Sequence, residues 1–251
     1  MIKSVQPNLS ILKNEKSKLN KNIIQYNDYE LNNLDYKEAI FIDKRNYIEY
    51  YFSLLRKKQI LIFTFYTYND YNSKSIKLCL FLFTFALYYV VNALFFNDST
   101  MHKIYQDKGM YDINYQIVHI IYSVIISDVI NIIINFLSLS EKIIISLKNK
   151  TNDIKEKKSK IIKCLKIKFI LFFIFIFLFL LLFWYYISCF CAIYKNIQIH
   201  LIKDTLISFG LSTLYPVFLS LIPGIFRIPA LKAKKQDKEC IYKFSKLIQL
   251  I

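Results

Sequence analysis

A line of polar residues crosses an otherwise apolar segment, residues 115–139, and it is the part of this 251-residue chain best suited to chemistry. Nearly all other positions in the segment are Ile, Val, Leu or Phe. On a helix, which turns by about 100° per residue, the polar residues fall on one side, with His119 and Asp128 near its two edges. The line consists of Gln116, His119, Ser123, Ser127, Asp128, Asn131, Asn135 and Ser138.

Two interpretations of this line remain open. Polar groups on a membrane helix must face other helices or water, because hydrocarbon offers them no hydrogen bonds. The line could therefore border a hydrated path or an ion site in which Asp128, near the middle of the segment, carries the charge. Alternatively, its Ser, Asn and Gln side chains hydrogen-bond between helices and hold a bundle or an oligomer together. We take interhelical bonding as the main expectation and the ion path as the alternative.

A second line of small residues lies in a later apolar segment, residues 205–226. Ser208, Ser212, Pro216 and Ser220 recur every four residues. Small side chains at this spacing let two helices approach closely. We therefore expect Ser208, Ser212 and Ser220 to form a helix-packing face.

Motifs of membrane enzymes are incomplete in this chain. Gly210-Leu-Ser212 is similar to the nucleophile motif of rhomboid proteases, but nothing in the sequence places His119 near Ser212. Cys189 and Cys191 are two positions apart, so on a helix they point to different sides and cannot chelate a metal together. We expect no catalytic residues, no metal site and no cofactor, and hence a protein that is not an enzyme.

The polar line and the line of small residues lie in two of four long apolar segments. These four segments predict an all-α, polytopic integral membrane protein. Lys168 and Lys195 bracket 26 uncharged residues. At about 1.5 Å rise per residue, a helix of that length exceeds a hydrocarbon core of about 30 Å. Pro216 and Pro223 are tolerated in a membrane helix and should kink the last one. The predicted spans are residues 77–97, 115–139, 169–194 and 205–226.

The distribution of charge predicts the orientation of these spans. The connection 141–168 and the tail 227–251 are rich in lysine, whereas the loops 98–112 and 195–204 are acidic or nearly neutral. Because cytoplasmic loops carry an excess of Lys and Arg, we expect both termini and the 141–168 connection to be cytoplasmic. Which cellular membrane holds the protein does not follow from the sequence.

The remaining segments are small. Residues 1–46 are polar and show no sustained periodicity, so we expect disorder or short helices there. Residues 47–74 combine a basic cluster with aromatic residues and predict an interfacial helical segment. Within the tail, apolar residues recur at spacings of three and four from Ile241 onward and predict an amphipathic helix. We expect that helix to lie on the cytoplasmic leaflet or on the basic connection. No second globular domain is indicated.

The strongly basic composition, with a net charge of +16, points to lipid rather than nucleic acid, because many of the lysines lie beside a span. Each lysine near an anionic membrane surface contributes about 1 kcal/mol to binding. A simpler alternative is that these lysines only determine topology. The lysines of the connection that could bind lipid headgroups are Lys155, Lys157, Lys158, Lys160, Lys163, Lys166 and Lys168.

Two neighbouring segments resemble a known family. Trp184-Tyr-Tyr-Ile-Ser-Cys-Phe-Cys-Ala-Ile-Tyr194 and Asp204-Thr-Leu-Ile-Ser-Phe-Gly-Leu-Ser212 are similar to the paired helices in the membrane region of polycystin-1-like proteins. The resemblance implies the membrane part of a receptor or channel assembly, and it carries no functional residue to this chain. Taken together, the sequence predicts a non-enzymatic anchoring or assembly module of a receptor-like membrane complex, which oligomerises through its polar and small-residue helix faces. The alternative is a channel or transporter subunit that uses the polar line as an ion path.

Overall fold

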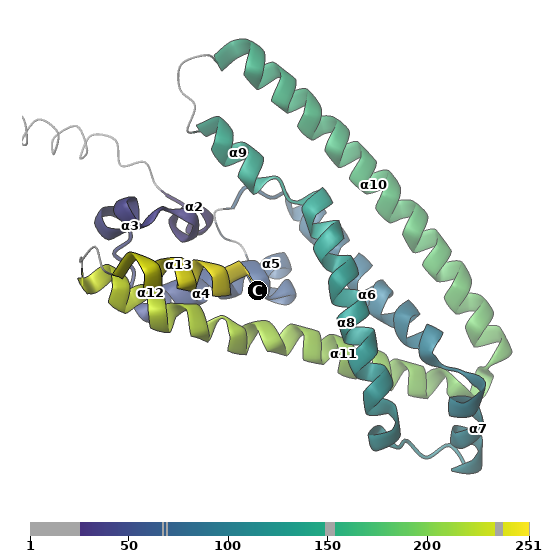
Figure 1. The fold of residues 1–251 in the computed structure, drawn as a ribbon. Helices are drawn as coiled ribbons and strands as arrows, with labels where there is room; N and C mark the ends of the chain where they lie inside the picture. Colours follow the sequence, from purple (N-terminus) through teal and green to yellow (C-terminus); the bar gives the residue numbers. More distant parts are fainter. Residues whose placement is uncertain (1–25, 67, 69, 149–153, 234–237, 251) are drawn as a thin grey trace, which may run out of the picture.

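The computed structural model describes residues 26–66, 68, 70–148, 154–233 and 238–250, and every regular element within them is helical (Figure 1). The predicted all-α class is thus confirmed for the described part of the chain. The helices are α2 (Asp28–Asn33), α3 (Tyr36–Ile42), α4 (Tyr47–Lys58), α5 (Ile60–Phe65), α6 (Lys74–Phe95), α7 (Asp98–Gln106), α8 (Ile113–Ser138), α9 (Glu141–Lys148), α10 (Ile154–Ile193), the 3-10 helix η1 (Lys195–Ile197), α11 (Gln198–Leu219), α12 (Leu221–Ala233) and α13 (Glu239–Leu250).

Four helical stretches are long and apolar enough to cross a membrane. They comprise Lys74–Phe95, Ile113–Ile145, Ser159–Ile193 and Lys195–Ala233. The four predicted spans lie within these stretches apart from one or two residues at their ends, which is compatible with a multi-pass integral membrane protein. The last stretch is interrupted at Ser220, between α11 and α12, one turn after Pro216. A proline supplies no backbone donor, so an interruption close to Pro216 and Pro223 is the expected result.

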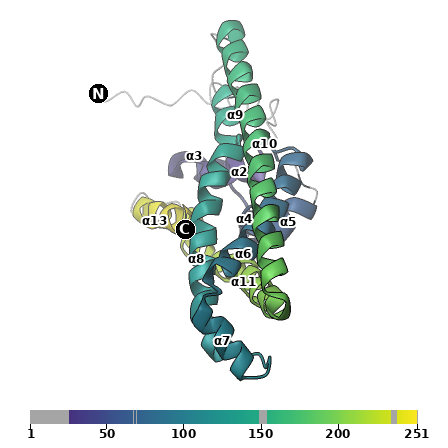
Figure 2. The same cartoon turned by 90° about the vertical axis from the view of Figure 1, so that its right-hand side faces the viewer.

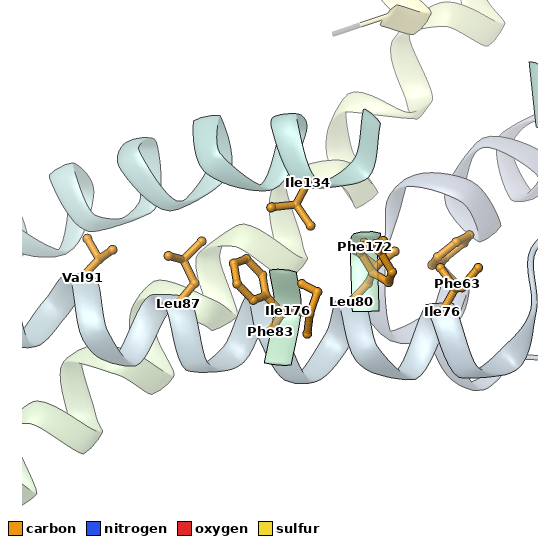
Figure 3. Close-up of a cluster of buried hydrophobic side chains, with 9 residues drawn as sticks. All are labelled: Phe63, Ile76, Leu80, Phe83, Leu87, Val91, Ile134, Phe172 and Ile176. Carbon is orange, nitrogen blue, oxygen red and sulfur yellow. The ribbon is translucent and has the colours of Figure 1, made fainter. Parts of the chain in front are cut away.

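Helix α6 is the centre of the bundle, because it packs against α8, α10 and α11. Its start is capped by the Ser73 side chain, which accepts a hydrogen bond from the Ile76 N–H. Apolar residues then recur every three or four positions and join residues of α5, α8 and α10 in one buried cluster (Figure 3). That cluster contains Phe63, Ile76, Leu80, Phe83, Leu87, Val91, Ile134, Phe172 and Ile176.

The two ends of the bundle differ in construction. At one end, α7 and η1 lie beside the end of α10 and the start of α11, and their side chains share a second apolar cluster (Figure 1). The opposite end carries the described helices nearest to both chain termini, α2 and α13, together with α9. Both described end regions of the chain therefore lie on the same side of the bundle.

Helix α10 differs from the other spans because it is long and little covered. Its 40 residues correspond to about 60 Å, twice the thickness of a hydrocarbon core. The helix extends past its neighbours at its N-terminal end (Figure 2). Along its apolar part only a few side chains, such as Phe172 and Ile176, are buried, whereas Trp184 is 76% exposed. A helix with this apolar outer surface suits contact with lipid.

The N-terminal helices form a small unit with the C-terminal ones. We call α2, α3, α4, α12 and α13 the helical platform. Side chains of α3 and of the residues around it share a buried cluster with Ala230, Leu231 and Tyr242. Within the segment 1–46 the structure has the short helices α2 and α3, while residues 1–25 lie outside the described part of the chain.

The C-terminal amphipathic helix is present as α13. It packs on α12 and α3 rather than on the basic connection, and its contact with the leaflet stays a prediction. The Tyr242 hydroxyl donates to the Leu34 carbonyl at 2.8 Å, and the Tyr50 hydroxyl donates to Gln249 at 2.9 Å. The reason is that α12 and α3 offer an apolar surface to which the face of α13 is complementary, and the contacts join residues about 200 positions apart.

Candidate functional site

Polar side chains of α6, α8 and α11 face one another inside the bundle, and we call them the polar seam. It contains the predicted polar line of α8 in part and adds partners from the two other helices. The members of the polar seam are Thr84, Tyr88, Asn92, Gln116, Ser123, Ser127, Asp128, Asn131, Asp204, Ser208 and Ser212.

Asp128 forms the centre of the polar seam. Its Oδ1 accepts hydrogen bonds from the Tyr88 hydroxyl at 2.5 Å and from the Ser212 hydroxyl at 3.0 Å. One side chain from each of three helices thus meets at this carboxyl group. The Tyr215 phenol also lies close to it. Among the described residues, no lysine, arginine or histidine forms an ion pair with Asp128.

Hydrogen-bonded pairs lie on both sides of this centre. The Thr84 hydroxyl donates to Asn131 Oδ1 at 3.1 Å, one helical turn from Tyr88. One turn in the other direction, Asn92 Nδ2 donates to the Ser208 hydroxyl at 3.1 Å. The sequence analysis missed the contribution of α6, although Thr84, Tyr88 and Asn92 follow one another at intervals of four residues. That spacing within an apolar span was the signal that could have revealed it.

A second carboxyl group, Asp204, closes the polar seam near α7. Asp204 is 1% exposed, and its Oδ1 accepts a hydrogen bond from the Tyr111 hydroxyl at 2.5 Å. Gln116 of α8 faces the same carboxyl group and donates to it when its amide nitrogen is turned inward. His200 is buried one turn before Asp204 and lies beside the Tyr111 ring. The sequence analysis assigned no role in a site to Asp204.

Three residues of the predicted line, His119, Asn135 and Ser138, lie outside the polar seam. The buried positions of α8 include 116, 120, 123, 127, 134 and 138, which are separated by three, four or seven residues and so lie on one side of the helix. His119 and Asn135 fall off that line. The His119 ring stacks on Phe95 with the ring centroids 6.0 Å apart, and Asn135 is exposed. Ser138 is buried and donates to the Asn135 carbonyl within its own helix.

Ser123 and Ser127 occupy the stretch of α8 between Gln116 and Asp128. Both are 0% exposed, and neither hydroxyl has a hydrogen-bond partner. An unpaired buried hydroxyl costs about 1–3 kcal/mol, so two in succession are unusual in a packed helix. The polar seam therefore holds spare hydrogen-bonding capacity on the route from Asp204 to Asp128.

The small residues of α11 occupy interior positions. Ser208 faces α6 through Asn92, and Ser212 faces α8 through Asp128. Ser220 is fully buried at the interruption between α11 and α12. These positions lie between helices of one chain, so the face predicted for packing is used within the protomer.

The lysines of the basic connection are continuous with a span, because α10 begins at Ile154. Lys160, Lys163 and Lys166 are exposed, and Lys168 Nζ donates to the Leu139 carbonyl at 2.7 Å. The side chains of Lys155, Lys157 and Lys158 lie outside what the structure describes. A straight helix moves away from the membrane by about 1.5 Å per residue, so only the lysines closest to the apolar part remain at headgroup level.

A buried ionic cluster, which sequence reasoning also missed, lies within the helical platform and joins the N-terminal helices to the end of the last span. Arg227 of α12 is 0% exposed, and its guanidinium donates to Asp43 Oδ2 at 2.8 Å and to the Leu31 carbonyl at 2.7 Å. Arg45 also binds Asp43, at 2.8 Å. Burial alone would raise the pKa of Asp43, but the hydrogen bonds and charges of Arg45 and Arg227 outweigh it, and the pKa lies below its ordinary value.

The carboxyl groups of the polar seam can bind protons. The hydrogen bonds of the polar seam and the ion pairs of the buried ionic cluster hold helices together. No group of three His, Cys, Asp or Glu side chains in the described ranges could hold a metal ion. Comparisons with protein-family models, with curated proteins and with solved structures find no match to this chain.

Proposed function

We propose that this chain is a non-enzymatic multi-pass membrane protein that anchors the helical platform at a membrane and serves as an assembly module there. The observation that supports this most is the ion pair between Arg227 and Asp43, which links the end of the fourth apolar stretch to the N-terminal helices through two fully buried charges. Such a pair costs several kcal/mol if one partner is lost, so the last span and the N-terminal helices are held in one fixed relation. The receptor-like character of the complex is proposed from the sequence resemblance alone.

We propose an orientation with both termini in the cytoplasm. Support comes from the excess of lysine at the end that carries α2 and α13, where the basic connection also lies. Two N-glycosylation sequons report the orientation. Asn149-Lys-Thr151 lies on the proposed cytoplasmic side and Asn97-Asp-Ser99 on the opposite side. In a secretory-pathway membrane, Asn149 should carry no glycan. Glycan on Asn149 would contradict the orientation.

Anionic lipid is the proposed partner of the cytoplasmic end. Lys163 and Lys166 are exposed at the border of the apolar part of α10, where a headgroup phosphate would lie. The K163A/K166A variant should bind vesicles containing phosphatidylserine more weakly, and the loss should diminish at high salt. Unchanged binding would favour the simpler interpretation, in which the lysines determine topology only.

Assembly with other chains must use surfaces other than the polar seam, since that seam is occupied within the protomer. The proposed surface is the outer face of α10, where Phe177 is 62% exposed while Phe172 is 2% exposed. Cysteines introduced singly at these positions give a matched pair. Disulfide-linked dimers should form through position 177 and not through position 172, and the size of the protein in mild detergent should exceed that of a monomer. A monomer without crosslinks at position 177 would refute self-assembly.

The alternative function, a channel or transporter subunit, is favoured by one specific observation. Asp128 lies in the middle of a span without a cationic partner among the described residues, and ionisable groups in such places are usually functional. Asp128→Asn separates the two proposals. A changed ion flux with normal oligomer size supports the channel, whereas normal flux with altered oligomer size supports the packing role.

A further inference from the structure

We infer that Asp128 is a reversible proton-binding site, which exchanges protons through the Asp204 end of the bundle only. The inference rests on the proposed insertion of the four spans into a membrane. It does not depend on the anchoring role. It also differs from an ion path, because it assigns access from one side.

The first step of the argument is the surroundings of the carboxyl group. The titratable groups that face Asp128 are the phenols of Tyr88 on α6 and Tyr215 on α11. Neither supplies a positive charge. Asp128 is half-buried between apolar helices. A carboxylate in such a place without a counter-charge is costlier than the neutral acid, so taking up a proton stabilises this arrangement.

The second step concerns the ligand. Tyr88 and Ser212 both donate their hydroxyl hydrogens to Oδ1, which leaves Oδ2 of Asp128 without a hydrogen bond in the described structure. A divalent metal ion needs about six or more oxygen ligands, and these three side chains do not provide them. A proton needs one oxygen. In the proposed step a hydronium ion transfers its proton to Oδ2, an O–H bond forms there, and a water molecule is released.

The third step is the route. On α11, Asp204, Ser208 and Ser212 are separated by one helical turn each, about 6 Å, and lead from the α7 end to Asp128. On α8, Ser123 and Ser127 lie along the same stretch with buried hydroxyls that lack partners. Such hydroxyls can receive water when the bundle opens transiently. The geometry thus offers acceptors and donors from Asp204 inward.

Beyond Asp128 the route is closed. After the Thr84–Asn131 pair, the next inward position of α8 is Ile134, which lies against the buried cluster that contains Leu80 and Phe83 (Figure 3). These side chains are at most 3% exposed. Among the described residues of α6 and α8, the Thr84–Asn131 pair is the last hydrogen-bonded pair before this apolar layer, so a proton that enters from the Asp204 end returns the way it came.

The test uses dicyclohexylcarbodiimide, an apolar reagent that adds to a protonated carboxyl group and leaves a stable acylurea. The full-length protein is placed in liposomes with one orientation, exposed to the reagent, and mapped by mass spectrometry. We expect Asp128 to be labelled at neutral pH while the exposed Asp98 is not. Raising the pH on the Asp204 side should suppress labelling, whereas raising it on the platform side should not.

Variants make the test specific. Y88F removes one donor to Oδ1, so labelling should persist to a pH about one unit higher, a tenfold gain in proton affinity. S123A/S127A should slow the change in Asp128 labelling after a change of external pH, without altering the final extent of labelling. D128N should carry no label at this site.

Each contrary result is decisive. Proton binding would be refuted if Asp128 is labelled only in the pH range in which Asp98 is labelled. It would also be refuted if Asp128 is not labelled in a protein that size-exclusion chromatography shows to be folded. An equal response to pH from both sides would refute one-sided access. Extraction of the protein from membranes by alkaline carbonate, measured on the same samples, tests the proposed membrane insertion separately.

Discussion

Removal of the Asp43 carboxylate should destabilise the protein more than any surface substitution. Asp43→Asn keeps the size of the side chain but leaves Arg227 with no counter-charge at 0% exposure. Breaking a buried pair by removing one partner costs about 3–5 kcal/mol, which is a large part of a typical total of about 5–15 kcal/mol. The two carbonyl contacts of Arg227 remain, and its guanidinium still lies against the Tyr50 and Tyr242 rings, so we expect the lower part of that range.

The measurement is thermal unfolding of the detergent-solubilised protein, followed by size-exclusion chromatography of the soluble fraction. Lys243→Ala is the matched control, because Lys243 forms an exposed ion pair with Glu239 at 2.9 Å, and its loss should leave the unfolding temperature unchanged. The double variant D43N/R227M removes both charges and should recover much of the lost stability. If Asp43→Asn unfolds at the same temperature as Lys243→Ala, the buried pair does not hold the platform, and the reasoning fails.

Three further predictions concern the platform. First, the pKa of Asp43 is below its ordinary value, so the stability from its charge is fully present above about pH 4. It is lost as the pH falls through the lower, folded value. D43N should abolish that acid-dependent loss in a pH series of unfolding temperatures. Second, a Cβ at Gly224 would lie 2.7 Å from a Tyr47 ring carbon, so Gly224→Ala should destabilise by about 1–3 kcal/mol. Gly210→Ala, which meets nothing within 4 Å, should be neutral or slightly stabilising, and equal effects of the two would contradict the contact. Third, deletion of residues 240–251 uncovers the α12 surface, so protease should cleave near Lys234 and Lys235 faster than in the full chain. Equal rates would indicate that α13 does not protect this segment.

The apolar spans could be predicted from the sequence because their signal is local. Each span is a continuous run of predominantly apolar residues, and its length alone is compared with the bilayer. The α6 positions that form the buried cluster follow the same local rule, since they recur every three or four residues. The start of α10 could not be predicted in this way. The lysines from 154 to 168 end the apolar run, but they are good helix formers and allow the helix to continue.

The partners of the polar residues could not be predicted, because they are distant in sequence. Asp128 binds Tyr88 and Ser212, which are 40 and 84 positions away. Arg227 and Asp43 are 184 positions apart. Periodicity indicates which side of a helix is polar, but it does not say which helix covers that side. His119 and Asn135 show the limit even within one helix, since a deviation of one position from the buried line was enough to turn them toward an aromatic ring or the exterior.

The polar seam also explains why α6, α8 and α11 pack in one register. Lipid is as apolar as Leu and Phe, so apolar contacts alone do little to prefer one alignment of membrane helices over another. In the observed register, Tyr88 meets Asp128 while, one turn away, Asn92 meets Ser208. A shift of α6 by one turn would place Thr84 or Asn92 opposite Asp128 and leave the Tyr88 hydroxyl without that acceptor. Because each unpaired polar group in an apolar bundle is costly, the shifted alignments are disfavoured together, and the same carboxyl group that can bind a proton also fixes the register of the three helices.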